Sequence, residues 1–326
     1  MKRVFKILSI CGGIGMGSEA IKQAIIDSGH EFIEIACVDF GELQEFVYYK
    51  NHAKGLYCRI DIRELTLEVL NAFLISKGRD TIQKQEIDLI LFSTSCTFAS
   101  GLNNYRTPYH EINQLTTVEI PRILREFEPK VGFIAENVGD IVTDKVLRPM
   151  FIEFKRALKS HGMYDFKYDV LNSADYNCWT SRPRLIILGK AKSLKAKITF
   201  PEPTTINYTD YYLNKLIPTA LRYNAGLYRY DIIDPETNML IGREEKWLSA
   251  DRIIGTVTAT GGEGILDSDY DKPRSLSIPE LKKIFGIEHF DFGDLDDSQI
   301  HFLIGNGIVV PFLRVIAKHY MDQFFN

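Results

Sequence analysis

The chain has 326 residues and a mass of 37.3 kDa, about twice the usual size of a single domain, so we expect one large domain carrying a smaller one, or two domains. Its composition, 45% hydrophobic and 25% charged, excludes disordered, collagen-like and coiled-coil proteins. The net charge of −4 excludes a uniformly cationic surface, so a nucleic-acid partner would need a local basic region.

The N-terminal residues do not form a signal peptide, because their short apolar stretch runs into glycines without a small-residue cleavage site. No apolar run approaches the roughly 18 residues that a membrane span needs. We therefore expect a cytoplasmic protein (nuclear in a eukaryote) with no membrane partner.

The five cysteines are odd in number and widely spaced, with no CxxC pair. This pattern disfavours both a disulfide framework and a zinc site, so we expect no metal. Any cysteine here is expected to be buried or reactive.

The first 190 residues alternate strand-like and helix-like segments. Such alternation predicts an α/β fold with a doubly wound, mostly parallel sheet. After the first strand a glycine-rich turn leads into a helix for which Ser18 is the expected N-cap. The expected strands are Val4–Ile10, Phe32–Val38, Asp88–Ser93, Val131–Ala135, Tyr168–Leu171 and Leu185–Leu188, and a helix is expected at Lys145–Lys159.

The texture of the chain changes after Lys190, where lysines and prolines lead into a tyrosine-rich stretch of little clear period. This stretch predicts a second, smaller and irregular domain. Further on, Ile278–Phe285 is expected to form a short helix and Gln299–Tyr320 a long one. We therefore divide the chain into a catalytic and cofactor-binding domain (1–190), a target recognition domain (191–290) and a C-terminal helix that returns to the first domain (291–326).

The glycine loop between the first strand and its helix is typical of a nucleotide-cofactor cradle, because glycines let a ligand approach the backbone at a helix N-terminus. Asp39, at the end of the second strand, is placed to accept hydrogen bonds from the ribose hydroxyls of an adenosine. Asp61 is a candidate acceptor for an adenine amino group. An NAD enzyme stays open from these residues alone.

Cys96 follows a buried strand in a loop of small residues, at the edge of the sheet where α/β proteins place ligands and nucleophiles. The commoner role of a cysteine is that of a small buried hydrophobe. Glu136 ends the next inferred strand, where a buried acid has a raised pKa and can transfer protons. Arg182 and Arg184 would bring two cations to the same edge, although arginines at a strand start are often solvated.

Taken together these motifs resemble those of the cytosine-5 DNA methyltransferases, in the family's order and over nearly the whole chain. The matching stretches are Gly13-Ile14-Gly15, Asp39-Phe40 with Tyr48 and Asn51, Asp61-Ile62, Ser95-Cys96, Glu136-Asn137-Val138, Thr180 to Arg184, Gly255 to Gly262, Arg274 to Leu281, and Gly305-Asn306-Gly307 with Pro311. An NAD dehydrogenase explains none of the later ones.

The resemblance implies a Rossmann-like class I methyltransferase fold, S-adenosyl-L-methionine as cofactor and S-adenosyl-L-homocysteine as product. It implies four catalytic residues, Cys96, Glu136, Arg182 and Arg184. The cofactor-binding residues it implies are Cys11, Gly13, Ile14, Gly15, Asp39, Phe40, Asp61, Ile62, Ser95 and Asn306. The implied substrate is double-stranded DNA, bound by a monomer that flips the target base out of the helix.

The loop around the nucleophile departs from the family pattern. Ser95 replaces the usual proline, Thr97 the usual glutamine, and Cys11 an aromatic residue of the first motif. Two alternatives therefore stay open: a cytosine-5 methyltransferase that acts on tRNA, and a catalytically impaired DNA-binding relative. Phosphate contacts are expected from the lysines at 190, 192, 195 and 197 and from the tyrosines that follow. The tyrosines could equally form the core of a small domain.

Overall fold

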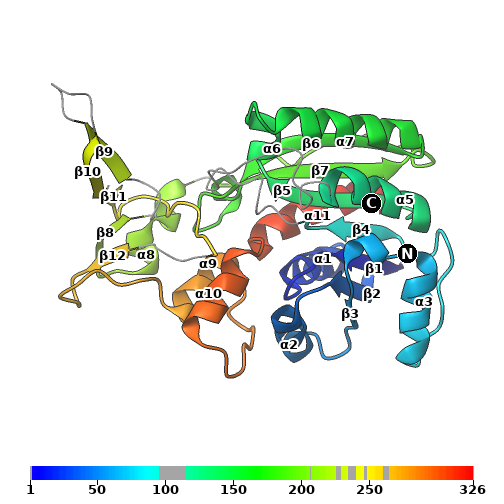
Figure 1. The fold of residues 1–326 in the computed structure, drawn as a ribbon, viewed down its shortest axis with the longest axis horizontal. Coiled ribbons are helices and arrows are strands. Elements are labelled where there is room, and N and C mark those ends of the chain that lie inside the picture. Colours follow the sequence, from blue (N-terminus) through cyan, green and yellow to red (C-terminus); the bar gives the residue numbers. More distant parts are fainter. Residues whose placement is uncertain are drawn as a thin grey trace.

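The computed structural model describes residues 2–94, 115–205, 207–224, 229–233, 240–245, 248–259 and 264–325. A seven-stranded sheet in the order β3-β2-β1-β4-β5-β7-β6 forms its centre (Figure 1). The strands are β1 (Val4–Ile10), β2 (Glu31–Asp39), β3 (Tyr57–Arg59), β4 (Leu89–Phe92), β5 (Gly132–Val138), β6 (Tyr164–Asn172) and β7 (Pro183–Ala191). The first five run parallel, whereas β7 is antiparallel to both of its neighbours. The α/β fold with a mostly parallel sheet is thereby confirmed.

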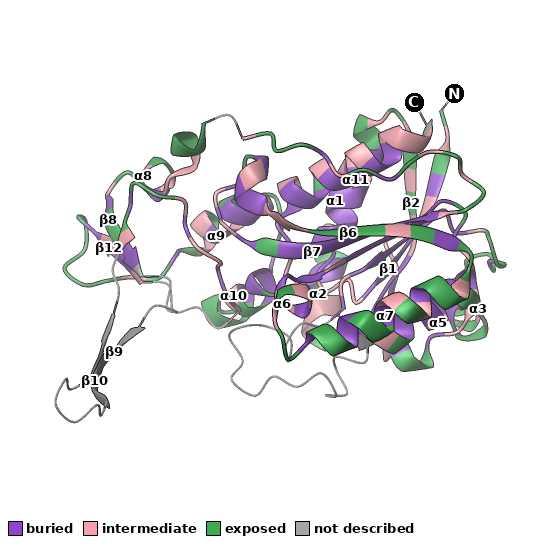
Figure 2. Cartoon of the chain, turned by 90° about the horizontal axis from the view of Figure 1, so that it is seen from above, coloured by how far each residue is buried: buried purple, intermediate pink, exposed green. Residues whose placement is uncertain are grey.

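Helices cover both faces of this sheet, because its strands carry apolar side chains on both faces. Helices α1 (Met16–Asp27) and α11 (Val310–Phe325) pack on one face, where Ile186 and Leu188 of β7 point. Helices α3 (Leu67–Ser76), α5 (Ile120–Phe127) and α7 (Arg148–His161) pack on the other, with Leu185 and Ile187 (Figure 2). Two further helices are α2 (Glu42–Asn51) and the short α6 (Asp140–Thr143).

Ser18 is not the N-cap that we expected for α1, because the helix begins three residues nearer the glycines, with Gly15 as its N-cap. Ser18 lies inside the first turn and is buried. Its hydroxyl donates to Glu34 Oε1 at 2.5 Å and lies 2.9 Å from Ser9 Oγ. The side chain therefore ties α1 to β1 and β2 instead of capping the helix.

The expected long C-terminal helix is two helices, α10 (Asp297–Gly305) and α11. At the break, the carbonyls of Gly305 and Gly307 accept hydrogen bonds from Arg182, and a Cβ on Gly305 would lie 2.4 Å from the backbone oxygen of Thr258. The expectation that no apolar run is long enough to cross a membrane was wrong for the stretch Asp297–Phe324, but 61% of its most apolar window is buried inside the protein. Its apolarity therefore serves the core, where Tyr320 donates to the carbonyl of Gly189 at 2.5 Å.

The segment after β7 forms a smaller body at one end of the molecule (Figure 1). It holds a three-stranded sheet in the order β11-β8-β12 and a hairpin. Its elements are α8 (Leu213–Leu216), β8 (Ala220–Asn224), β9 (Arg229–Ile233), β10 (Leu240–Glu245), β11 (Leu248–Ser249), β12 (Gly264–Asp267) and α9 (Ile278–Phe285). Arg274 joins this sheet to α9, since it bonds to Asp267 at 2.9 Å and to Glu280 at 2.8 and 2.9 Å.

The lysine cluster that we expected to contact phosphates begins at the edge of the sheet opposite the carboxyl ends of the parallel strands. Lys190 pairs with Gly132, at the start of β5, whereas Arg184 pairs with Val138 at its other end. The Lys190 ammonium is also buried, 3.0 Å from Asp165 and 2.8 Å from the carbonyl of Leu194. Because β7 runs antiparallel to β5, its last residues lie far from the carboxyl edge. Lys190 is thus a structural residue, and the expectation of a phosphate contact there was wrong.

Candidate active site

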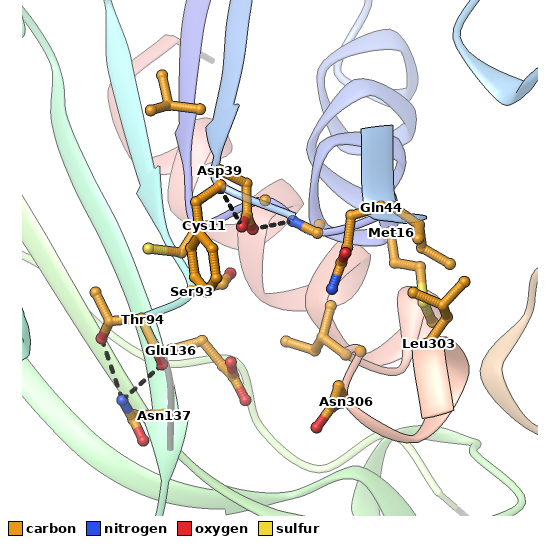
Figure 3. Close-up of a pocket in the computed structure, with 18 of the residues that line it drawn as sticks. Cys11, Met16, Asp39, Gln44, Ser93, Thr94, Glu136, Asn137, Leu303 and Asn306 are labelled. Carbon is orange, nitrogen blue, oxygen red and sulfur yellow. Dashed lines mark hydrogen bonds between the residues drawn. The ribbon is translucent and has the colours of Figure 1, made fainter. Parts of the chain in front are cut away.

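A cavity of about 610 Å³ opens at the carboxyl ends of β1, β2, β4 and β5. This edge is where ligands bind in open α/β sheets, because the strand order reverses there. Figure 3 shows Cys11 and Asp39 on one side, Glu136 and Asn137 of β5 on another, and Asn306 across from them. Every predicted site residue that the structure describes, except Gly15, lines this cavity.

The loop between β1 and α1 contains one position, Gly15, whose backbone conformation and surroundings allow only glycine. Gly15 has φ +86°, and a Cβ there would lie 2.2 Å from Nε2 of His52, so the residue packs against α2's end behind the loop. Gly13, by contrast, has nothing within 4 Å of where its Cβ would be. The loop therefore packs against the protein at Gly15 and leaves free space for a ligand at Gly13.

Asp39 and Phe40 lie at the end of β2, above this loop. The Asp39 carboxylate accepts hydrogen bonds from the backbone N–H groups of Gly13 at 2.8 Å and Phe40 at 2.7 Å. Burial nevertheless raises the pKa of Asp39, which these bonds only partly offset. Phe40 is 74% exposed, an unusual position for a large apolar ring, and it lines the cavity. A carboxylate beside a free aromatic face suits a ribose and an adenine.

Asp61 and Ile62 form the next part of the wall. The Asp61 carboxylate accepts from the backbone N–H and from Nε of Arg63, both at 2.9 Å, and this pairing lowers the pKa of Asp61. Ile62 is buried at 5% exposure. Asp61 therefore stays an anion, and Arg63, which we did not single out from the sequence, lines the cavity with it.

Arg182 lies in the cavity wall, but its guanidinium is engaged with backbone. It donates to the carbonyls of Val257 at 2.6 Å, Gly305 at 2.8 Å and Gly307 at 2.9 Å, and it stacks over the ring of Phe285. Only 4% of the residue is exposed. Arg182 thus holds the turn that carries Asn306 into the cavity, through the carbonyls on either side of Asn306.

Replacing Arg182 by methionine should destabilise the protein and loosen the cofactor end of the cavity. Three buried carbonyls would lose their donor, for a loss of about 3 kcal/mol in the free energy of unfolding. Urea unfolding measures this loss, and calorimetry measures the weaker binding of S-adenosylmethionine. The matched control is Arg314→Met, because the Arg314 side chain is 44% exposed and forms a surface ion pair with Asp27, so we expect less than about 1 kcal/mol there. Equal losses in both variants would contradict the assigned role.

Glu136 and Arg184 form an ion pair at the other end of the cavity. Arg184 Nε lies 2.9 Å from Glu136 Oε1, and both side chains are nearly buried, at 9% and 12% exposure. Burial raises the pKa of Glu136 above its usual value of 4.5, although Arg184 and Arg182 lower it in part. The raised pKa agrees with the sequence-based expectation. A carboxyl group of this kind can give a proton to a ring nitrogen, with a guanidinium beside it to hold the group in place.

Two of the predicted residues, Ser95 and Cys96, lie outside the residues that the structure describes. The last described residue before them, Thr94, also lines the cavity and bonds to Asn137, the neighbour of Glu136. Cys96 is therefore placed only by the chain, two residues beyond Thr94. The described cysteines are all buried or half-buried.

The cavity fits S-adenosylmethionine at its glycine-loop end. Free space at Gly13, a buried acid with an exposed aromatic neighbour, and the amide of Asn306 across from them are the parts that an adenosine and an amino acid require. Sequence reasoning missed several wall residues: Met16, Gln44, Arg63, Phe302 and Leu303. The helical residues among them belong to no recognisable sequence motif. They reach the wall only because of how α2 and α10 pack against the loop.

Comparisons with known proteins agree with this geometry. The family model described as C-5 cytosine-specific DNA methylase matches residues 3–322. "Type II methyltransferase M.MthTI" of Methanothermobacter thermautotrophicus is 38% identical over 242 residues, 60% of this chain and 67% of that protein. "Type II methyltransferase M.XorII" of Xanthomonas oryzae pv. oryzae is 35% identical over 125 residues, 38% of this chain and 28% of that protein.

Solved structures share the fold over nearly the full chain. The Dnmt2 methyltransferase of S. pombe has a TM-score of 0.68 at 17% identity, with 98% of each chain covered. A structure described as a putative DNA modification methyltransferase of an E. coli prophage has a TM-score of 0.66 at 16% identity, covering 98% of this chain and 99% of that one. Identities this low show the fold alone.

Proposed function

The chain belongs to the C-5 cytosine-specific DNA methylases and is a DNA (cytosine-5-)-methyltransferase; from this premise we propose that it uses S-adenosylmethionine, with Cys96 as nucleophile and Glu136 as proton donor. The observation that carries the proposal is the buried Glu136–Arg184 pair, which lies in the same cavity as Asp39 and Asn306. One end of the cavity holds the cofactor and the other holds the target base.

The residues act in a fixed order. The Cys96 thiolate adds to carbon 6 of the cytosine, the electron pair of the C5–C6 double bond forms a C4–C5 double bond, and the pair of the C4–N3 double bond moves onto N3. Glu136 donates its proton to N3 as negative charge develops there, and Arg184 holds both Glu136 and the cytosine O2. Carbon 5 is now nucleophilic and takes the methyl group. A base then removes the proton from carbon 5, the C6–S bond breaks so that Cys96 leaves as a thiolate, and N3 returns its proton to Glu136.

The cofactor supplies a methyl group on a positively charged sulfur, which leaves as the neutral thioether S-adenosylhomocysteine. Asp39 would accept hydrogen bonds from the ribose hydroxyls through the lone pairs that Gly13 and Phe40 do not use. The ring of Phe40 would stack on the adenine, Asp61 would accept from its amino group, and Ile62 would pack against it. Asn306 would hold the methionine end, in the position that Arg182 fixes.

Duplex DNA is the substrate that we propose, because the two curated relatives are named as type II methyltransferases. The base must leave the helix to reach a cavity this deep, at a cost of a few kcal/mol that protein contacts recover. We further propose that residues 191–290 contact the DNA, that residues 291–326 complete the catalytic domain, and that the chain acts as a monomer.

Methyl transfer from labelled S-adenosylmethionine tests the choice of substrate. We expect label in the cytosines of duplex DNA, and none in tRNA, after incubation of the protein with each in parallel. Digestion to nucleosides and chromatography identify 5-methylcytosine as the product. Label confined to tRNA would overturn the DNA assignment and leave the chemistry intact. Cofactor binding with no label in either would favour a binding protein without activity.

A further inference from the structure

Three buried polar side chains meet at the base of the segment that carries Cys96. The hydroxyl oxygens of Thr94 and Thr116 are 2.6 Å apart, although 22 positions separate them in the chain. Asn137 Nδ2 donates to the carbonyl of Thr94 at 3.0 Å and lies 3.2 and 3.4 Å from the hydroxyls of Thr94 and Thr116. Each of the three residues is only 4% exposed. Figure 3 shows the two bonds between Asn137 and Thr94 beside Glu136.

The orientation of the Asn137 amide is fixed by its own backbone. Its Oδ1 accepts from the N–H of Val138 at 2.8 Å, so Nδ2 must face Thr94 and Thr116. Asn137 belongs to β5, and Thr94 is the second residue after the short β4 that pairs with it. One side of the cluster is therefore built into the centre of the sheet.

Thr116 is held in place by the helix that follows it. It lies in the π-helical turn Leu115–Glu119, which leads into α5. In the next turn Arg122 bonds to Glu119 at 2.6 Å and to the carbonyls of Leu65 and Ile62 at 2.6 and 2.7 Å. These contacts tie the start of α5 to the part of the cavity wall that holds Ile62. The hydroxyl of Thr116 consequently reaches Thr94 from a fixed position.

We propose that the contacts among Thr94, Thr116 and Asn137 form a clamp that fixes Thr94, and that this fixed starting point, two residues before Cys96, positions Cys96 for its attack on carbon 6. This inference rests on the proposed role of Cys96. Burying a hydroxyl group without a hydrogen-bond partner costs free energy, so Thr94 and Thr116 are favoured in the positions where their hydroxyls bond to each other. This bond therefore restricts the position of Thr94. Thr116 is a positioning residue, because it acts on the reaction only through Thr94 and the chain that follows it.

The decisive variant is Thr116→Val, which keeps the shape of the side chain and removes its hydroxyl. We expect kcat for methylation of duplex DNA to fall about tenfold, the size of effect that one lost buried hydrogen bond produces. The rate at which the protein forms a covalent complex with duplex DNA containing 5-fluorocytosine should fall by the same factor. The affinity for S-adenosylmethionine should stay within about twofold, because the cofactor residues are untouched. Thr116→Ser, which restores the hydroxyl, should recover both rates.

Thr66→Val is the matched control. The hydroxyl of Thr66 also makes a hydrogen bond, accepting from the N–H of Val69 at 3.1 Å, but it lies outside the cavity and outside the segment that we propose contacts DNA. If Thr116→Val is as fast as Thr66→Val, or if Thr116→Ser is as slow as Thr116→Val, the clamp does not position the nucleophile. If the unsubstituted protein itself neither methylates DNA nor forms the complex, the proposed function fails and the clamp fails with it.

Discussion

Replacing Cys96 by alanine should abolish both methyl transfer and the covalent complex with DNA that contains 5-fluorocytosine. Fluorine at carbon 5 cannot leave as a cation, so the base cannot be released once Cys96 has added and the methyl group has moved. The unsubstituted protein should therefore form a complex that survives denaturation and migrates slowly in a denaturing gel. In Cys96→Ala no such band should appear, although the cofactor should still bind.

The other four cysteines make this experiment specific. Burial raises the pKa of Cys58 to about 11 and that of Cys178 to about 12, and it raises the pKa of Cys11 and Cys37 well above the usual value. A thiol attacks as its thiolate, so none of these four is an effective nucleophile near pH 7. Cys178→Ala is the matched control, because it removes a buried thiol outside the cavity, and it should still give the complex. A complex in Cys96→Ala would show that another residue is the nucleophile.

Replacing Glu136 by glutamine should lower kcat by about 10²–10⁴-fold, the usual contribution of a general acid. Glutamine has nearly the same shape and can still lie beside Arg184, but it has no carboxyl proton to give to N3. Steady-state methylation of duplex DNA measures the loss. Glu280→Gln is the control, since Glu280 also pairs with an arginine, at 2.8 Å, but in the smaller body of the protein. An unchanged kcat in Glu136→Gln would remove Glu136 from the mechanism.

The pH dependence has a defined sign. The pKa of Glu136 is raised by burial, so its proton-donating form is present below that pKa and is lost as the pH rises through it. We expect kcat of the unsubstituted protein to fall along this alkaline limb, and the limb to be missing in Glu136→Gln. Arg184 lowers the pKa of Glu136, so Arg184→Met should move the limb to higher pH as well as reduce kcat. A limb that moves to lower pH would contradict the ion pair.

The same shift affects stability. A carboxyl group whose pKa is higher in the folded state binds its proton more tightly there. The stabilisation from protonated Glu136 is complete below its usual pKa of 4.5 and is lost as the pH rises through the folded value. At neutral pH the buried charge therefore depends on Arg184 for compensation.

Local patterns in the sequence predicted the fold class and most of the candidate site. Alternating apolar segments predicted the covered sheet, and residues at the carboxyl ends of its strands, such as Asp39 and Glu136, were predicted to meet at one edge. Parallel strands bring their carboxyl ends together whatever the details of packing, so order along the chain is enough for this inference. The glycine loop was equally readable, because a left-handed residue such as Gly15 is a local requirement.

Contacts between distant segments were decided only by the tertiary structure. The chain breaks between α10 and α11 where Gly305 packs on the backbone of Thr258, and Lys190 lies beside the start of β5 because β7 runs antiparallel to β5. Arg182 depends on the tertiary structure in the same way: the sequence placed it in a motif, and the fold brings its Nη1 and Nη2 groups to three carbonyls from two other segments. A residue type in a motif fixes what a side chain can bind, whereas its actual partners depend on which distant backbone groups packing leaves within reach of it.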